Sequence, residues 1–158
     1  MSNCVKYLRN TTYNLKKKLN ILIVDDDKEG SDFFKDILEM RGHTVQIVNE
    51  GIRTINYIKN NMFDIIFLDC HMGDIDGITL ANIIKDIIGY NSLIFAYTGD
   101  NSNITINSFK KTGVNGILIK PININKINKI LNLFETIKIE KLDEFKTNRI
   151  IDGSIIFF

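Results

Sequence analysis

The sequence predicts a doubly wound α/β fold, in which a five-stranded parallel sheet is covered by helices on both faces. Three observations support this prediction. Short apolar runs alternate along the chain with stretches of helical periodicity, as in a series of strand and helix pairs. The runs are almost continuously apolar, which is typical of strands buried on both faces. The 158 residues also suffice for one domain with a substantial core.

The first half of the chain supplies three of the predicted strands. An apolar run at 20–25, NILIVD, predicts a strand that ends in acid. A helix is predicted over 29–41 because Gly42 follows as a stop signal, and His43 in the next turn is expected at the surface. The remaining elements of this half are a strand over 44–48, a helix over 52–61 and a strand over 64–69.

The second half continues the alternation. Isoleucines at helical spacing predict a helix over 77–88, and the more polar stretch 101–112 predicts a weaker helix. An amphipathic helix over 123–138 closes the series. Between these helices, strands are predicted over 92–97 and 116–119.

Residues 19–140 are therefore expected to form the domain, with a basic extension at 1–18 and a tail at 141–158. The tail carries Asp152-Gly153 between apolar residues, which is a hairpin signal. The chain ends in apolar residues whose exposure would favour aggregation. We expect them to pack on the domain or on a second copy of the chain in a homodimer.

The composition excludes several classes of function. The 20 basic residues are matched by 19 acidic ones, so the chain lacks the basic excess that nucleic-acid binding requires. No segment reaches the roughly 18 apolar residues of a membrane span, and the first residues do not form a signal peptide. Cys4 and Cys70 have neither metal-site nor disulfide spacing. We therefore expect a cytoplasmic protein that binds neither nucleic acid nor membrane.

Acidic residues close two of the predicted strands. Asp25 and Asp26 follow the first strand, and Asp69 ends the third. In a parallel sheet the carboxyl ends of the strands lie at one edge, where we expect bound ligands. Three carboxylates gathered there cannot all stay ionised unless a cation neutralises them. Since Mg²⁺ prefers oxygen ligands and is usually held by one or two carboxylates and phosphate oxygens, we predict Mg²⁺ as the cofactor.

Two further strands end in groups that suit a phosphoryl group. Thr98 ends the fourth strand, and Gly99 leaves room beside it. Lys120 ends the fifth strand and precedes Pro121, the only proline. A hydroxyl, an ammonium and a metal around Asp69 would provide the positioning and charge neutralisation on which phosphoryl transfer depends.

These residues resemble the receiver domains of response regulators, and most of all those of hybrid histidine kinases and phosphorelays. The resemblance covers about 19–138, with the flavodoxin-like strand order 2-1-3-4-5. It rests on four motifs, which are ILIVDDD at 21–27, FLDCHMGDIDG at 67–77, YTG at 97–99 and IKPI at 119–122.

The resemblance implies a signalling domain that takes a phosphoryl group from a partner phosphohistidine and promotes only its own phosphotransfer and autodephosphorylation. Asp69 would be the phosphorylated residue and, with Thr98 and Lys120, the catalytic set. Asp25, Asp26, Asp69 and the backbone carbonyl of His71 would bind Mg²⁺. The partner would be a histidine kinase or a histidine phosphotransfer protein.

The chain departs from the family pattern at two places. Gly73 replaces the usual proline, so the loop after Asp69 is expected to be more flexible. In the family, a threonine and an aromatic residue move inward together as a switch. Thr98 and Ile117 occupy these two positions here, so only the threonine matches the family. Phosphoryl transfer needs no atom of that aromatic residue, so the departures favour a relay over control of an output domain.

Partner docking is expected at Phe33, Pro121 and Ile122. Phe33 falls near the exposed side of the first helix, whereas Phe34, Ile37 and Leu38 are core candidates. Asp74 and Asp76 are expected to be loop or helix-capping acids.

Two other functions remain alternatives. A phosphorylation-independent pseudo-receiver would act only as a protein-interaction module and would bind no Mg²⁺. A phosphate-ester hydrolase would usually carry a second acid at the position of His71.

Overall fold

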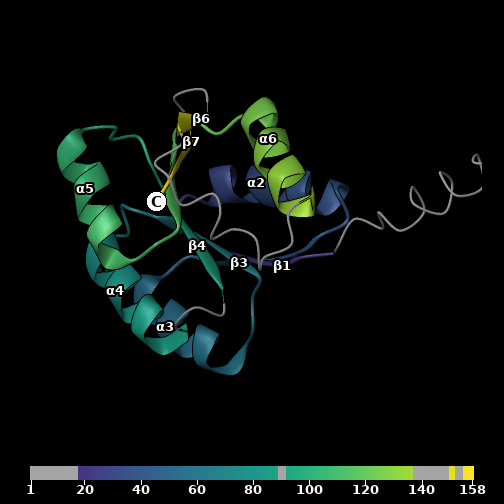
Figure 1. The fold of residues 1–158 in the computed structure, drawn as a ribbon. Coiled ribbons are helices and arrows are strands. Elements are labelled where there is room, and N and C mark those ends of the chain that lie inside the picture. Colours follow the sequence, from purple (N-terminus) through teal and green to yellow (C-terminus); the bar gives the residue numbers. More distant parts are fainter. Residues whose placement is uncertain (1–17, 89–91, 137–149, 152–154) are drawn as a thin grey trace, which may run out of the picture.

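The computed structural model describes residues 18–88, 92–136, 150–151 and 155–158 (Figure 1). Its elements in chain order are β1 (Asn20–Val24), α2 (Lys28–Met40), β2 (Thr44–Val48), α3 (Gly51–Asn60), β3 (Ile65–Asp69), α4 (Gly77–Ile88), β4 (Leu93–Thr98), α5 (Asn103–Thr112), β5 (Gly116–Ile119), α6 (Ile124–Thr136), β6 (Ile150–Ile151) and β7 (Ile155–Phe157). The predicted elements of the domain all form, with ends that shift by one or two residues where the structure describes them.

The first five strands are parallel and run in the order β2-β1-β3-β4-β5, as predicted. The chain moves outward from β1 to β2 and then returns to the other side of β1 with β3, so the order reverses between β1 and β3. In sheets of this kind the crevice at the carboxyl ends of the two strands is the usual ligand site.

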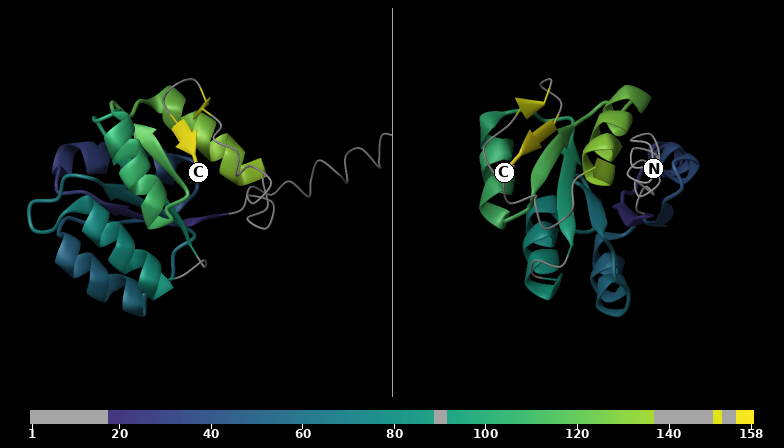
Figure 2. Two further views of the ribbon diagram at one scale, coloured as in Figure 1. Left: turned by 60° about the vertical axis from the view of Figure 1, so that its left-hand side comes forward. Right: turned by 45° about the vertical axis from the view of Figure 1, so that its right-hand side comes forward.

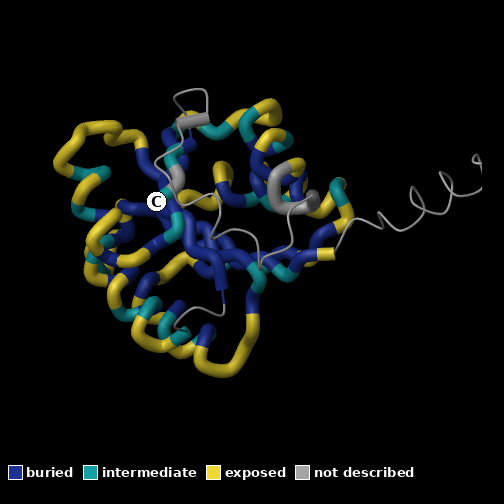
Figure 3. Tube along the Cα trace, in the orientation of Figure 1, coloured by how far each residue is buried: buried dark blue, intermediate teal, exposed yellow. Residues whose placement is uncertain are grey.

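Helices cover both faces of the sheet. Figure 2 shows α2 and α6 on one face and α3, α4 and α5 on the other. Successive strand residues point to opposite faces, so Ile21 and Ile23 join the cluster under α2 and α6, while Leu22 and Val24 join the cluster under the other three helices. The central strands are accordingly buried on both sides (Figure 3).

Within the described residues the sheet has seven strands, which are the five predicted parallel strands and two short strands on either side of the hairpin signal at 152–153. β7 pairs antiparallel with β5, and β6 pairs antiparallel with β7, so the C-terminal strands extend the sheet beyond β5. A Cβ on Gly116 would lie 2.4 Å from the carbonyl oxygen of Ile156, so β7 can approach this closely only because residue 116 is glycine. The extension at 1–17, the tail residues 137–149 and the turn 152–154 lie outside the described residues.

His43 corrects an expectation. It was predicted at the surface, but it is only 5% exposed. Its Nδ1 accepts a hydrogen bond from the backbone N–H of Leu19, 3.1 Å away, just before β1. The ring therefore supplies a partner to a buried donor at the start of the sheet.

None of the helices in the described parts of the chain is long and apolar enough to cross a membrane.

Candidate functional site

Three carboxylates lie at the crevice between β1 and β3. Asp25 and Asp26 directly follow β1, and Asp69 is the last residue of β3. Each offers a carboxylate oxygen, and the three oxygens lie within 4.8 Å of one another. Asp25 and Asp69 are buried, whereas Asp26 is exposed, so the cluster opens to solvent on the side of Asp26.

Both oxygens of Asp25 accept hydrogen bonds. Oδ1 accepts the backbone N–H of Asp27 at 2.9 Å, and Oδ2 accepts the hydroxyl of Tyr97. Burial raises the pKa of Asp25 above its ordinary value of 3.8, and the nearby Asp69 adds to the rise, while the Tyr97 hydrogen bond opposes it. The carboxylate is thus oriented by two donors in an environment that disfavours its charge.

Asp69 forms an ion pair with Lys120 at this edge of the sheet. The Nζ of Lys120 is 3.3 Å from Oδ1 of Asp69, and the backbone N–H of His71 donates to the same oxygen at 3.3 Å. Lys120 directly follows β5, and its peptide bond to Pro121 is cis. Two strands that are not neighbours in the sheet thereby bring an acid and a base together.

The donor set fits a divalent cation. Three carboxyl groups gather here against one lysine, so the acidic groups outnumber the basic one by two. The ligand atoms are all hard oxygens, which suit Mg²⁺, and the exposed side of Asp26 gives access for an ion that keeps several of its waters. Asp25, Asp26 and Asp69 are the residues that could hold it.

Thr98 and His71 line a cavity near Asp69. Thr98 ends β4 next to β3, and its hydroxyl oxygen accepts the backbone N–H of Asp100 at 3.0 Å. The cavity has a volume of about 150 Å³ and is also lined by the thiol-bearing Cys70, among others. Burial raises the pKa of Cys70 to about 12, so its thiol stays neutral.

Two aspartates hold the loop after Asp69 by hydrogen bonds, which limit the flexibility expected from Gly73. The carboxylate of Asp74 accepts the backbone N–H groups of Gly51 at 3.0 Å and Ile52 at 2.8 Å, at the start of α3. Bonds from Ile52 and Gly51 lower the pKa of Asp74. Asp76 accepts the N–H of Thr79 at 3.0 Å and caps α4. The predicted capping roles are confirmed, and Asp74 caps a helix that is distant in sequence.

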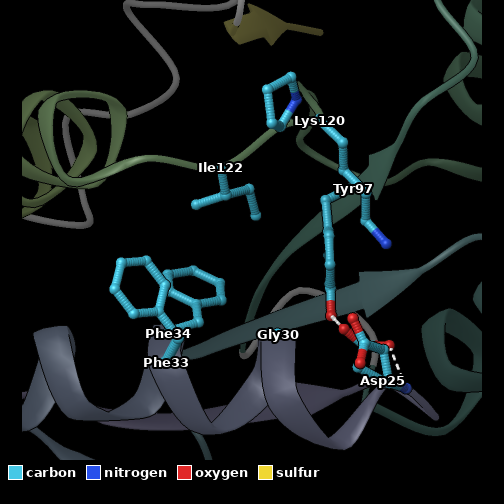
Figure 4. A pocket seen from close by; sticks show the side chains of 9 residues that line it. Asp25, Gly30, Phe33, Phe34, Tyr97, Lys120 and Ile122 are labelled. Atoms are coloured by element: carbon cyan, nitrogen blue, oxygen red, sulfur yellow. Dashed lines mark hydrogen bonds between the residues drawn. The ribbon is translucent and has the colours of Figure 1, made fainter.

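A groove of about 390 Å³ lies beside the carboxylates (Figure 4). Phe33, Pro121 and Ile122 all line it, and Asp25, Tyr97 and Lys120 form its polar end. Phe33 is 52% exposed, while its neighbour Phe34 is buried, as expected. The three predicted docking residues therefore share one surface next to Asp25.

Ile117, by contrast, lies away from this surface. It is fully buried in β5, pairs with Ala96 and Ile156, and packs under α3, α4 and α5. Tyr97 was predicted as a strand residue and quoted in the YTG motif, but no role was assigned to it. Its hydroxyl contacts Asp25, and the centroid of its ring lies 4.6 Å from the Nζ of Lys120. The motif and its place at a strand end beside Thr98 were the available signals.

The model of the response regulator receiver domain matches residues 21–132, which include the three carboxylates, Thr98 and Lys120. The chain belongs to the response regulator receiver family. It is a receiver domain homologous to those of sensor kinases, and the family is a signalling family.

Several known proteins are similar to this receiver domain. The transcription factor SKN7 of Saccharomyces cerevisiae is 29% identical over 123 residues, which are 78% of this chain and 20% of SKN7. Further relatives include sensor histidine kinases, and the chain spans a fifth or less of the first curated relatives that it matches.

Two solved structures are informative. A response regulator protein from Burkholderia pseudomallei, with a phosphorylated aspartic acid and a calcium ion, is 26% identical with a TM-score of 0.67, covering 82% of this chain and 71% of that chain. The Ssk1 receiver domain of S. cerevisiae, solved with the phosphotransfer protein Ypd1, has a TM-score of 0.70 at 23% identity, covering 77% and 91%. At 23% identity, the likeness to the Ssk1 receiver domain concerns the fold alone.

Proposed function

We propose that Asp69 accepts a phosphoryl group from the phosphohistidine of a partner protein, in a reaction that depends on Mg²⁺. The observation that carries the proposal is the position of Asp69, which lies between two other carboxylates and the ammonium of Lys120, 3.3 Å away. A metal on one side and an ammonium on the other can neutralise the oxygens of a phosphoryl group.

In the proposed step, a carboxylate oxygen of Asp69 attacks phosphorus while the bond from phosphorus to the donor imidazole nitrogen breaks. The bonding pair leaves with the imidazole, and Asp69 becomes an acyl phosphate. Lys120 and the N–H of His71 hold one oxygen of Asp69 and thus orient the carboxylate for attack. Mg²⁺, held by Asp25, Asp26, Asp69 and the His71 carbonyl, would neutralise the phosphoryl oxygens.

Thr98 completes the set. Its oxygen accepts an N–H from Asp100, and its own proton would be donated to a phosphoryl oxygen. That bond would draw the end of β4 toward Asp69 and act as the switch, since one new charged group can bias two arrangements of a loop. Ile117 fills packed core at the position where the family has its moving aromatic residue, which favours a relay over control of an output domain.

The phosphoryl group would be lost from Asp69 by hydrolysis. A water molecule attacks phosphorus, the bond from phosphorus to the Asp69 oxygen breaks, and phosphate leaves with the carboxylate restored. On this proposal the chain promotes its own modification and its removal, and it turns over no separate substrate.

The groove is the proposed docking surface for the partner, either a histidine kinase or a histidine phosphotransfer protein. It borders Asp25 and Lys120, so a helix seated on Phe33, Pro121 and Ile122 would bring a histidine near Asp69. The solved complex of Ypd1 with the Ssk1 receiver domain is a precedent within the same fold.

Incubation with acetyl phosphate and Mg²⁺ tests the proposal without a partner. We expect the intact mass to rise by one phosphoryl group, and borohydride trapping should place it at Asp69. The Asp69→Asn variant should stay unmodified, as should wild type in EDTA. The matched control Asp86→Asn removes an exposed carboxylate from α4 and should behave as wild type.

Absence of modification in wild type, together with no Mg²⁺ binding, would favour the pseudo-receiver alternative. Modification that persists in Asp69→Asn would show that another residue is the acceptor.

A further inference from the structure

Tyr97 occupies an unusual position between the two halves of the site. It is only 2% exposed and lies in β4, directly before Thr98, so its side chain points to the opposite face of the sheet from that of Thr98. Figure 4 shows its hydroxyl directed at the carboxylate of Asp25 and its ring beside the ammonium of Lys120.

A buried tyrosine usually finds a hydrogen-bond partner for its hydroxyl, and any buried acceptor could serve. The hydroxyl meets one of the carboxylates that could hold Mg²⁺. The second oxygen of Asp25 accepts the N–H of Asp27, so donors hold both oxygens. Each oxygen keeps a further lone pair for a metal or for a metal-bound water. The orientation of Asp25 is therefore set before any ion binds.

The ring of Tyr97 contacts a different residue of the site, Lys120. The Nζ of Lys120 lies 4.6 Å from the ring centroid and 3.3 Å from Oδ1 of Asp69. An ammonium over an aromatic face is attracted by it, and the long lysine side chain loses much of its freedom there. The ring thus favours the lysine conformation that reaches Asp69.

We propose that Tyr97 is a positioning residue for phosphoryl transfer: its hydroxyl orients Asp25 for Mg²⁺, and its ring holds Lys120 beside Asp69. This inference rests on the proposed function. It also rests on the two contacts of the Tyr97 side chain, one with Asp25 and one with Lys120.

Two substitutions separate the two contacts. Tyr97→Phe removes the hydroxyl and keeps the ring, so the affinity for Mg²⁺, measured by calorimetry, should fall about tenfold, as is typical when a partner of a metal ligand is lost. At saturating Mg²⁺ its affinity for beryllofluoride should stay near that of wild type. Tyr97→Leu also removes the ring, so at saturating Mg²⁺ its affinity for beryllofluoride should fall roughly three- to tenfold below that of wild type.

Phe95→Leu is the matched control. Phe95 is an equally buried aromatic residue two positions earlier in β4 and on the same face, and its ring packs against the core residue Phe67. This variant should keep wild-type affinity for both ligands. Circular dichroism and thermal unfolding report whether each variant is folded, and Tyr97→Phe still tests the proposal if Tyr97→Leu fails to fold.

A double-mutant cycle shows whether Tyr97 acts through Asp25. In an Asp25→Asn background, Tyr97→Phe should lower the Mg²⁺ affinity no further. An equal loss in both backgrounds, or wild-type Mg²⁺ affinity in Tyr97→Phe, would overturn the inference while leaving the proposed function intact. If wild type itself binds neither Mg²⁺ nor beryllofluoride, the proposed function fails and the inference fails with it.

Discussion

The carboxylate of Asp25 is almost fully buried, and burial favours its neutral form, whereas metal binding needs it ionised. The raised pKa of Asp25 reflects this conflict in the metal-free protein. Tyr97 and the N–H of Asp27 offset part of the cost by donating to the charged form. If Asp25 binds Mg²⁺ as proposed, its buried position lowers the stability of the metal-free fold, and metal binding offsets that cost.

A prediction follows for Asp25→Asn in the absence of divalent cations. The pKa of Asp25 is higher in the folded state, so the folded protein binds more protons between the ordinary pKa of 3.8 and the raised value. The wild-type free energy of unfolding thus falls as pH rises through that window. Asp25→Asn lacks this loss, and near neutral pH it should be more stable than wild type by about 0.5–2 kcal/mol.

Urea unfolding in EDTA over a series of pH values measures this difference. The advantage of Asp25→Asn should shrink as the pH falls toward 3.8. A stability difference that is independent of pH, or one that grows on acidification, would contradict the claim that burial of the Asp25 carboxylate lowers stability. Asp86→Asn controls for the loss of a carboxylate as such.

At the scale of elements, helix α2 serves two surfaces. Phe34, Ile37 and Leu38 pack on the sheet, and Phe33, one residue from this face, lines the groove at half exposure. Helical periodicity predicts the first set because it is local to the helix. The loop that follows β5 completes the groove with Pro121 and Ile122. The proposed docking surface therefore depends on two elements that the fold brings together.

Phe33→Ala should slow phosphotransfer from a protein donor and leave chemical phosphorylation unchanged. With a phosphorylated histidine phosphotransfer protein as the donor, the transfer rate should fall about tenfold, because truncating a central aromatic residue of an interface costs roughly 1–2 kcal/mol or more. Modification by acetyl phosphate should proceed at the wild-type rate. Met40→Ala, on the same helix at 85% exposure and outside the groove, is the control.

Equal transfer rates for Phe33→Ala and wild type would remove Phe33 from the docking surface. An equal loss with both donors would point to a damaged site instead.

The elements also show where prediction from sequence ends. Strands and helices of the domain follow from local periodicity and stop signals, so their bounds are predicted to within a residue or two. The partner of β7 does not follow, because strand pairing is non-local, although Gly116 leaves the space that β7 uses. His43 was misjudged for the same reason, since its partner Leu19 is 24 residues away.

At the scale of the whole molecule, parallel topology explains why the site could be anticipated. Strand ends that are far apart in sequence meet at one edge, so Asp25, Asp26, Asp69 and Lys120 converge once the strand order is known. Tyr97 could not be anticipated in the same way. Alternation gives the face on which its side chain lies, but the contact with Asp25 crosses β3 and depends on the spacing and twist of the sheet.

Beryllofluoride, which mimics a phosphoryl group on aspartate, tests most directly whether these residues form one phosphoryl-accepting pocket. We expect fluorine resonances of bound beryllofluoride to appear when Mg²⁺ is titrated into the wild-type protein, and to be absent in EDTA and in Asp69→Asn. Asp26→Asn should require more Mg²⁺ for the same signal. No bound signal in wild type at saturating Mg²⁺, or an unchanged signal in Asp69→Asn, would contradict the account.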